Sequence, residues 1–190
     1  MDLKVKNTTK IIGDRAFSSN INIVNKIGDL VIEKFHYNKI GTVIKHIPGH
    51  GLAKSDSHIR TPYIYKNLNY LKRNDFKVFK NKKSIFAMTA HIIFSKIDPT
   101  YTVTHSKKLI NIIRNEINFK NLIISDDISM KSLKFSTLTN TQKAFQAGCN
   151  LVLHCNARMS EMKVVAENSP KLDNFLLKKT LEFYKLVNIK

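Results

Sequence analysis

Four short runs of apolar residues alternate along the chain with longer stretches of helical period. The runs lie at residues 42–44, 84–88, 122–124 and 151–153, and each one ends in polar residues. Continuous apolar runs of this length are typical of parallel strands that are buried on both faces of a sheet. The pattern therefore predicts four buried parallel strands with polar side chains at their carboxyl ends.

Apolar residues recur at intervals of three and four between and after these runs. The spacing predicts a helix over residues 21–35 that is capped by Ser19 or Asn20, a second helix over 109–117 and a terminal helix over 172–186. Strands that alternate with helices indicate an α/β fold.

The polar strand ends decide between two α/β architectures. Ionisable side chains gather at the carboxyl ends of several successive strands, where a (β/α)8 barrel places its chemistry. The alternative is an open doubly wound sheet, but no GxGxxG or Walker A sequence opens any predicted helix. We therefore predict a barrel. A complete barrel takes about 250 residues, so the 190 residues of this chain supply only about six of its eight units.

Composition narrows the class of protein. An apolar fraction of 43% is typical of a globular domain. No apolar run approaches the ~18 to 20 residues that span a membrane, and the first residues do not resemble a secretory signal. We therefore expect a cytoplasmic protein with no membrane partner.

The formal net charge of +18 raises the alternative of a nucleic-acid partner, because cationic side chains neutralise phosphates. However, 27 of the 32 basic residues are Lys and only five are Arg. Recognition of phosphates and bases favours the planar Arg fork. In the densest basic stretch, residues 77–83, Phe79 and the preceding Phe76 have a spacing compatible with a helix face. We interpret the charge as a solvated basic surface and expect no nucleic-acid partner.

The first candidate site is the loop that begins after Lys45, where Pro and Gly residues at 48–51 end the strand. Three histidines, His46, His50 and His58, lie on or beside this loop. A polar surface loop and a metal site are both possible interpretations. The histidines lie on or beside a loop and form no helical HxxxH site, and no acidic or Cys ligand is placed to complete a metal site. We predict no metal.

The Asp56-Ser57-His58 spacing favours a third interpretation of the same loop. Residues two apart in an extended loop point the same way, so Asp56 could accept a hydrogen bond from one ring nitrogen of His58. This bond would fix the tautomer of His58 and raise the basicity of its other nitrogen. The pair would then form a proton-transfer dyad on a mobile loop.

The second candidate site follows the strand at residues 122–124, where Ser125, Asp126 and Asp127 come in succession. Carboxylates at the end of a buried strand are usually functional or tightly hydrogen-bonded. We expect Asp127 or Ser129 to cap a following helix. Asp126 is placed to attack an electrophile while an acid on a loop approaches from the other side. A nucleophilic carboxylate with one acid/base is the machinery of retaining glycoside hydrolysis.

These stretches resemble the bacterial β-N-acetylhexosaminidases of glycoside hydrolase family 3, in family order over about residues 1–160. Residues 45–51 with 56–58 resemble the KH-F-PGHG…DSH signature, residues 124–130 the SDDLSM segment, and residues 88–91 with 98–99 the intervening strand and loop. Residues 13–17 are similar to the family's G-[DE]-R-S-[FY] stretch, and residues 147–150 to its AGCD.

The resemblance implies a hydrolase that releases N-acetylglucosamine from cytoplasmic cell-wall fragments during peptidoglycan recycling, without a cofactor. It implies that Asp126 is the nucleophile, that His58 is the acid/base and that Asp56 is the dyad partner of His58. Residues that bind the sugar would be Arg15, Lys45 and His46. We expect His50 and His91 to structure the pocket, and Cys149, His154 and Cys155 to pack around a buried strand.

The sequence departs from the family pattern at single positions and, more seriously, at the start of the chain. Asn121, Ile47, Ala16 and Asn150 replace Gly, Phe, Ser and Asp, and none of them removes a catalytic side chain. The first two strands and most of the third, with a DQEGG segment that grips sugar hydroxyls, have no counterpart.

We therefore expect residues 1–190 to form a single incomplete barrel that lacks the first two to three βα units. It would have five strands, or six with a stub at residues 3–5. Either a separate polypeptide supplies the rest, or the chain is an inactive remnant.

Overall fold

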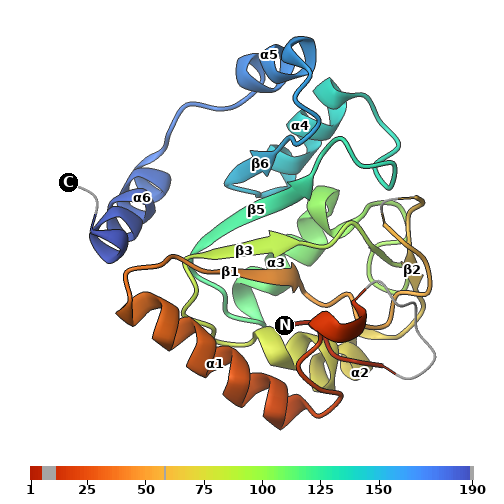
Figure 1. Cartoon of the computed structure of the whole chain (residues 1–190). Helices are drawn as coiled ribbons and strands as arrows, with labels where there is room; N and C mark the ends of the chain where they lie inside the picture. The colour runs from red at the N-terminus through yellow and green to blue at the C-terminus, as the bar shows by residue number, and fades with distance from the viewer. Residues whose placement is uncertain (6–11, 58, 189–190) are drawn as a thin grey trace.

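A parallel four-stranded sheet forms the centre of the computed structural model, which describes residues 1–5, 12–57 and 59–188. The strands are β1 (Val43–Ile47), β3 (Phe86–Thr89), β5 (Leu122–Asp127) and β6 (Leu151–Leu153), and they pair in that order (Figure 1). Two short strands, β2 (Tyr63–Ile64) and β4 (Ile93–Phe94), form a separate parallel pair. All four strand predictions are confirmed, and neighbours in the sheet are consecutive strands of the predicted series.

Helices connect the strands and confirm the α/β class. The α-helices are α1 (Ile21–Tyr37), α2 (Leu68–Arg73), α3 (Lys107–Asn115), α4 (Thr137–Ala147), α5 (Met159–Glu167) and α6 (Asn174–Val187). Three 3-10 helices, η1 (Gly13–Arg15), η2 (Asp75–Phe79) and η3 (Val103–His105), lie in the connections. The predicted cap of the first helix is Asn20, whose side chain accepts hydrogen bonds from the amides of Asn22 and Ile23.

The two faces of the sheet differ in burial, which corrects the prediction that the strands are buried on both faces. Ile44, Ala87 and Ile123 pair in one row across three strands, and all are buried. The next row, Lys45, Met88 and Ile124, is exposed or half-buried. Successive residues of a strand face opposite sides, so the second row marks the more open face. In Figure 1, α3 and α4 lie behind the sheet and cover the first face.

The basic stretch at residues 77–83 has an apolar inner side, as the spacing of its phenylalanines predicted. Phe76 and Phe79 lie in η2 and are buried. The ring of Phe76 meets that of Phe94 edge to face, with centroids 5.5 Å apart. The lysines of this stretch other than Lys82 are exposed, and buried Lys82 forms an ion pair with Asp29 of α1 at 2.8 Å.

Several predicted element limits were wrong. Residues 3–5 form no strand, and the described residues contain four strands in the main sheet rather than five or six. The second predicted helix ends at Asn115, before Ile117, and the terminal helix begins at Asn174, after Leu172. The terminal helix lies near the amino ends of the strands, where the rings of Phe183 and Phe86 are 5.2 Å apart.

Arg114 joins α3 to the amino ends of two strands. Its Nη1 donates to the carbonyls of Phe119 and Asn121, and its Nη2 donates to Asn150 Oδ1 at 2.6 Å. The same Asn150 oxygen accepts from the amide of Ile123 in β5 at 2.9 Å. One guanidinium therefore donates to three oxygens, and two of them, the carbonyls of Phe119 and Asn121, depend on it for a side-chain donor.

We expect Arg114→Ala to lower the free energy of unfolding by about 2 to 4 kcal/mol, because it leaves these oxygens without their donor. Urea unfolding followed by circular dichroism measures the change. Arg73→Ala removes an exposed arginine and serves as the control, with an expected change within about 0.5 kcal/mol. Equal effects of the two substitutions would contradict the role of Arg114.

Candidate active site

The carboxyl end of β1 contains one residue more than the neighbouring strand. Lys45 pairs with Met88 and Ile47 pairs with Thr89, so His46 is the additional residue of a β-bulge. The Lys45–His46 and Ile47–Pro48 peptide bonds are both cis. A bulge redirects side chains at the end of a strand. In this way His46 reaches the edge of the sheet where the predicted nucleophile lies.

Asp2 organises this loop, and sequence reasoning missed it. Its Oδ1 accepts a hydrogen bond from the amide of His50 at 2.7 Å, and its Oδ2 accepts from the amide of His46 at 3.0 Å and from His46 Nδ1 at 2.8 Å. Burial by itself would raise the pKa of the Asp2 carboxyl. The hydrogen bond from His46 and the electrostatic attraction of neighbouring groups, the amino terminus among them, outweigh burial and hold that pKa at about 2. Asp2 is therefore an ionised buried acceptor.

The ionised Asp2 carboxylate fixes the tautomer of His46. A carboxylate only accepts hydrogen bonds, so the proton of a neutral His46 ring is on Nδ1. Its Nε2 then has a free lone pair and lies 3.9 Å from Asp126 Oδ2. This distance is too long for a direct hydrogen bond. A hydroxyl group placed to one side of the line between the two atoms could lie within hydrogen-bond distance of both.

Asp126 has one engaged and one available carboxylate oxygen. It lies at the end of β5 on the more open face, and its side chain is 20% exposed. Oδ1 accepts a hydrogen bond from the amide of Asp127 at 2.9 Å. Oδ2 faces His46. Asp126 can therefore present an oxygen to an electrophile above the sheet.

Asp127 differs from Asp126 because backbone amides occupy its carboxylate. Its Oδ1 accepts from the amide of Ser129 at 3.0 Å and from the amide of Cys155 at 3.1 Å, and the Ser129 hydroxyl also contacts both oxygens. The prediction that Asp127 or Ser129 caps the next helix was wrong. That helix begins at Thr137, and its cap is Ser136. Asp127 instead holds the ends of β5 and β6 together.

His91 is buried behind Asp126 with both ring nitrogens engaged. Its Nε2 lies 2.9 Å from the carbonyl of Asp127, and its Nδ1 lies 2.7 Å from Thr104 Oγ1. Burial lowers its pKa. His50 is also buried, with its Nε2 3.4 Å from Ser57 Oγ, and burial lowers its pKa as well. This geometry supports structural rather than proton-transfer roles for both histidines.

A buried carboxyl lies beneath the turn at Gly49. The φ angle of Gly49 is +144°, and a Cβ at this position would lie 2.7 Å from Asp75 Cβ. Both conditions exclude a side chain at residue 49. Burial, assisted by the charge of Asp2, raises the pKa of Asp75 to about 7. The loop is thus supported by an ionised carboxylate at Asp2 and by a carboxyl that resists ionisation at Asp75.

The other predicted site residues are Asp56, His58, Lys45 and Arg15. His58 lies outside the described residues, so the Asp56–His58 dyad stays a prediction; Asp56 itself is half-buried. Lys45 is exposed on the open face of β1, and Arg15 is exposed at the end of η1. The structure brings His46 and Asp126 together, with His46 Nε2 3.9 Å from Asp126 Oδ2.

The two cysteines differ in burial. Cys149 is buried, as expected for a packing residue, and burial raises its pKa to about 12, whereas Cys155 is exposed, which corrects the expectation for that residue. Within the described residues, no three His, Cys, Asp or Glu side chains are grouped to hold a metal ion. The helices of the described ranges include none with the length and apolar character to cross a membrane.

Comparisons with known proteins connect this geometry to one family. The family model described as "Glycosyl hydrolase family 3 N terminal domain" matches residues 1–177. A β-hexosaminidase of Idiomarina loihiensis is 33% identical over 172 residues, which cover 88% of this chain and 52% of the relative. A β-hexosaminidase of Haemophilus influenzae is 32% identical over 172 residues, with 85% and 49% coverage. The chain thus spans about half the length of these curated relatives.

Solved structures share the same arrangement of strands and helices. Native NagZ from Neisseria gonorrhoeae superposes with a TM-score of 0.84 and 27% identity, covering 96% of this chain and 53% of NagZ. A family 3 β-N-acetylglucosaminidase from a Paenibacillus species superposes with a TM-score of 0.87 over 99% of this chain and 39% of its own, and at 20% identity it speaks for the fold alone. These superpositions confirm the prediction of a partial (β/α)8 barrel.

The contribution of Asp2 to stability should depend on pH. A carboxyl whose pKa is lowered on folding stabilises the protein above its unfolded pKa and loses that effect as the pH falls toward its folded pKa. For Asp2 the window runs from about pH 4 down to about pH 2. We expect Asp2→Asn to lower the free energy of unfolding by about 2 kcal/mol at pH 7, and the difference from the parent to narrow below pH 4.

Urea unfolding at pH 7, 5, 4, 3 and 2 measures this difference. Asp14→Asn removes an exposed carboxylate and serves as the matched control, with a small and constant difference at every pH. A pH-independent penalty for Asp2→Asn would show that its role is steric rather than electrostatic.

Proposed function

The chain belongs to glycosyl hydrolase family 3, whose N-terminal domain it matches, and we propose that it carries the catalytic side chains of a retaining β-N-acetylhexosaminidase. The observation that supports this function most is the environment of Asp126. One of its oxygens is engaged by a backbone amide, and the other faces the imidazole that Asp2 orients. Among the described residues, Asp126 and Asp127 are the carboxylates at the end of a central strand, and hydrogen bonds occupy Asp127.

In the proposed reaction, Asp126 Oδ2 attacks the anomeric carbon of a terminal β-linked N-acetylglucosamine. The bond between that carbon and the glycosidic oxygen breaks, and the leaving oxygen receives a proton from His58. A glycosyl ester of Asp126 results. Water then attacks the same carbon, gives a proton to His58 and restores the Asp126 carboxylate. Asp56 would orient His58, and no cofactor enters either step.

His46 suits the role of a sugar-binding residue. Its Nε2 lone pair can accept a hydrogen bond from a sugar hydroxyl that lies beside both His46 and Asp126, because Asp2 holds the ring proton on Nδ1. Lys45 projects from the open face of the same strand. Arg15 would approach from η1. We assign these three residues to binding of the terminal sugar.

The substrates we propose are fragments of peptidoglycan that end in N-acetylglucosamine, processed in the cytoplasm during recycling of the cell wall. The relatives named β-hexosaminidase support a terminal hexosamine in the substrate. Because the chain spans about half of those relatives, the activity we propose belongs to the complete barrel. Residues 1–190 would form one domain of that assembly.

The sheet itself suggests how the barrel is completed. In the described residues, β1 and β6 each pair on one side only, and the open face between them carries exposed or half-buried side chains. Unpaired strand edges and half-covered apolar faces are where further strands add. We propose that a second polypeptide segment, with the strands that close the barrel, pairs with these edges.

Co-expression of this chain with the complementary part of the I. loihiensis relative tests the assembly. We expect the two polypeptides to co-elute in size-exclusion chromatography and to hydrolyse a chromogenic N-acetylglucosaminide faster than either part alone. A disruptive variant provides a second arm of the test. Val43→Lys adds a charge on the open face of the edge strand, where Val43 is 48% exposed, and should weaken co-elution. Separate elution with no gain in activity would contradict the assembly.

The role of Asp126 is tested by substitution in the co-expressed assembly that hydrolyses the chromogenic substrate. We expect Asp126→Ala to lower kcat/KM by about 10³-fold or more, because the covalent step has no nucleophile. Azide should partly restore turnover in this variant and yield a glycosyl azide of inverted configuration, detectable by NMR. The matched control Asp127→Asn retains the nucleophile, so its loss of activity should be much smaller and insensitive to azide. Turnover unchanged in Asp126→Ala would exclude the proposed function.

A further inference from the structure

Two buried carboxyl groups from different parts of the chain support the turn at residues 46–50. Asp2 binds the backbone amides of His46 and His50. Asp75 begins the 3-10 helix η2, which packs against β1, and only 2% of its surface is exposed. Asp2 orients the sugar-binding histidine, whereas Asp75 takes no direct part in the proposed reaction. The function of this second carboxyl group follows from its contacts with the turn.

The side chain of Asp75 lies directly against the backbone of Gly49. A Cβ at residue 49 would be 2.7 Å from Asp75 Cβ and 3.4 Å from Asp75 Oδ1. Among the described residues, this Oδ1 atom has no hydrogen-bond partner, although it is buried. A buried carboxylate is costly when one of its oxygens lacks a donor. The geometry of the turn therefore favours the neutral form of the Asp75 carboxyl group.

The charged groups around η2 also favour the neutral form. Burial and the negative charge of Asp2 raise the pKa of Asp75 to about 7. The elements that pack against η2 are β1, α1 and α2. Their histidines and the histidine after β1 have other partners, namely Thr42 for His36, Asp2 for His46 and Ser57 for His50. Their other charged side chains are exposed, namely Lys26, Asp29, Glu33, Lys34, Lys45, Lys72 and Arg73. Lys82, which follows η2, is buried and paired with Asp29.

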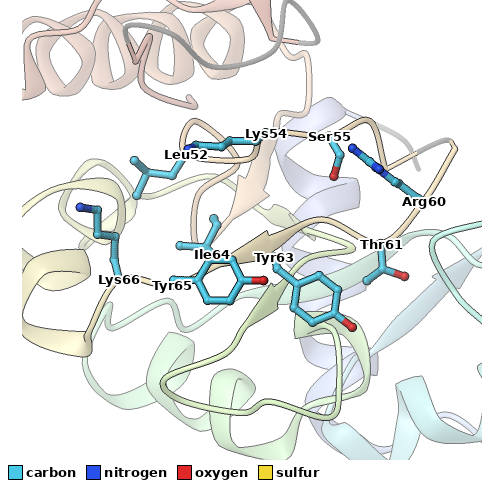
Figure 2. Close-up of a pocket in the computed structure, with 9 residues that line it drawn as sticks. All are labelled: Leu52, Lys54, Ser55, Arg60, Thr61, Tyr63, Ile64, Tyr65 and Lys66. Atoms are coloured by element: carbon cyan, nitrogen blue, oxygen red, sulfur yellow. The ribbon is translucent and has the colours of Figure 1, made fainter.

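Backbone hydrogen bonds connect the turn to His46 and to the loop that follows. The amide of Gly49 donates to the carbonyl of His46 at 2.7 Å, so a displacement of residue 49 acts directly on His46. The amide of Ala53 donates to the carbonyl of His50 at 3.0 Å, which joins the turn to the loop at residues 52–60. Figure 2 shows this loop along one side of a cavity of ≈ 620 Å³. A movement of the turn therefore reaches both His46 and the wall of this cavity.

We propose that Asp75 is a positioning residue, which holds His46 in its sugar-binding orientation only while the Asp75 carboxyl group keeps its proton. The neutral group fits beneath Gly49. When the proton leaves to solvent, the negative charges of Asp2 and Asp75 act on one buried turn and repel each other. Outward movement of the turn relieves this repulsion and moves His46 away from Asp126. The inference rests on the proposed function for its effect on sugar binding, and it sets an alkaline limit to that binding.

Carbon-13 NMR of the aspartate carboxyl groups tests the first step on the chain itself, without substrate. We expect the Asp75 carboxyl to titrate at about pH 7, and the amide signals of Gly49 and His50 to change over the same range. Asp2→Asn should lower the titration midpoint of Asp75, because it removes the neighbouring negative charge. A midpoint of Asp75 near pH 4, or a titration that leaves the amide of Gly49 unchanged, would overturn the proposal.

The co-expressed assembly that hydrolyses the chromogenic substrate tests the effect on sugar binding. We expect KM to rise about tenfold from pH 6 to pH 8, because only the protonated form of Asp75 holds His46 in place. Asp75→Asn keeps the shape of the side chain without its charge, and it should reduce this KM ratio to less than about twofold. Glu167→Gln removes an exposed carboxylate from the end of α5 and should retain the full ratio. The pH dependence of kcat should be similar in all three proteins.

The outcomes separate this inference from the proposed function. A rise in KM that persists in Asp75→Asn, or a KM that stays constant in the starting assembly, overturns the inference and leaves the hydrolase function standing. An assembly without hydrolase activity contradicts the proposed function, and the carboxyl titration of the chain then decides alone whether Asp75 controls the turn. Urea unfolding curves check that the variants fold. Asp75→Ser, which is also uncharged and is smaller, replaces Asp75→Asn if the asparagine variant does not fold.

Discussion

The buried carboxylate of Asp2 is the contact on which the geometry of the candidate site depends. It joins the start of the described chain to a loop more than forty residues later and binds two backbone amides and one imidazole. A buried charge is costly unless it is well hydrogen-bonded, and these three donors supply the compensation. Loss of the Asp2 carboxylate would leave the loop after β1 without the partner that sets the direction of His46.

The two neighbouring aspartates at the end of β5 show how the backbone assigns different chemistry to the same side chain. Asp127 accepts hydrogen bonds from two loops and so stabilises the rim of the sheet. Asp126 receives only the amide of its neighbour and keeps one oxygen directed toward His46. The difference arises from the alternation of side chains along a strand, which turns one carboxylate to the open face and the next toward the adjoining connections.

The sequence predicted the parts of the structure that depend on local pattern. The four central strands and the helix that Asn20 caps follow from apolar period and capping chemistry. Asp126 could be placed because it comes two residues after the apolar run at 122–124 and therefore at the carboxyl end of a strand. The role of Asp2 could not be predicted, since it depends on contacts with residues far along the chain. The cap expected at Asp127 or Ser129 was wrong because a loop separates them from the next helix, and that loop had no distinct apolar signal.

Strand β3 lies between the two strands that carry His46 and Asp126. In a flat sheet, two strand spacings amount to about 9.6 Å, yet the facing atoms of these side chains are 3.9 Å apart. The reach of the side chains and the inward bend of the sheet together close that difference. The separation between the proposed nucleophile and the sugar-binding histidine therefore depends on how far the sheet bends. A neighbouring strand that changed the bend would change this distance without any contact with His46 or Asp126.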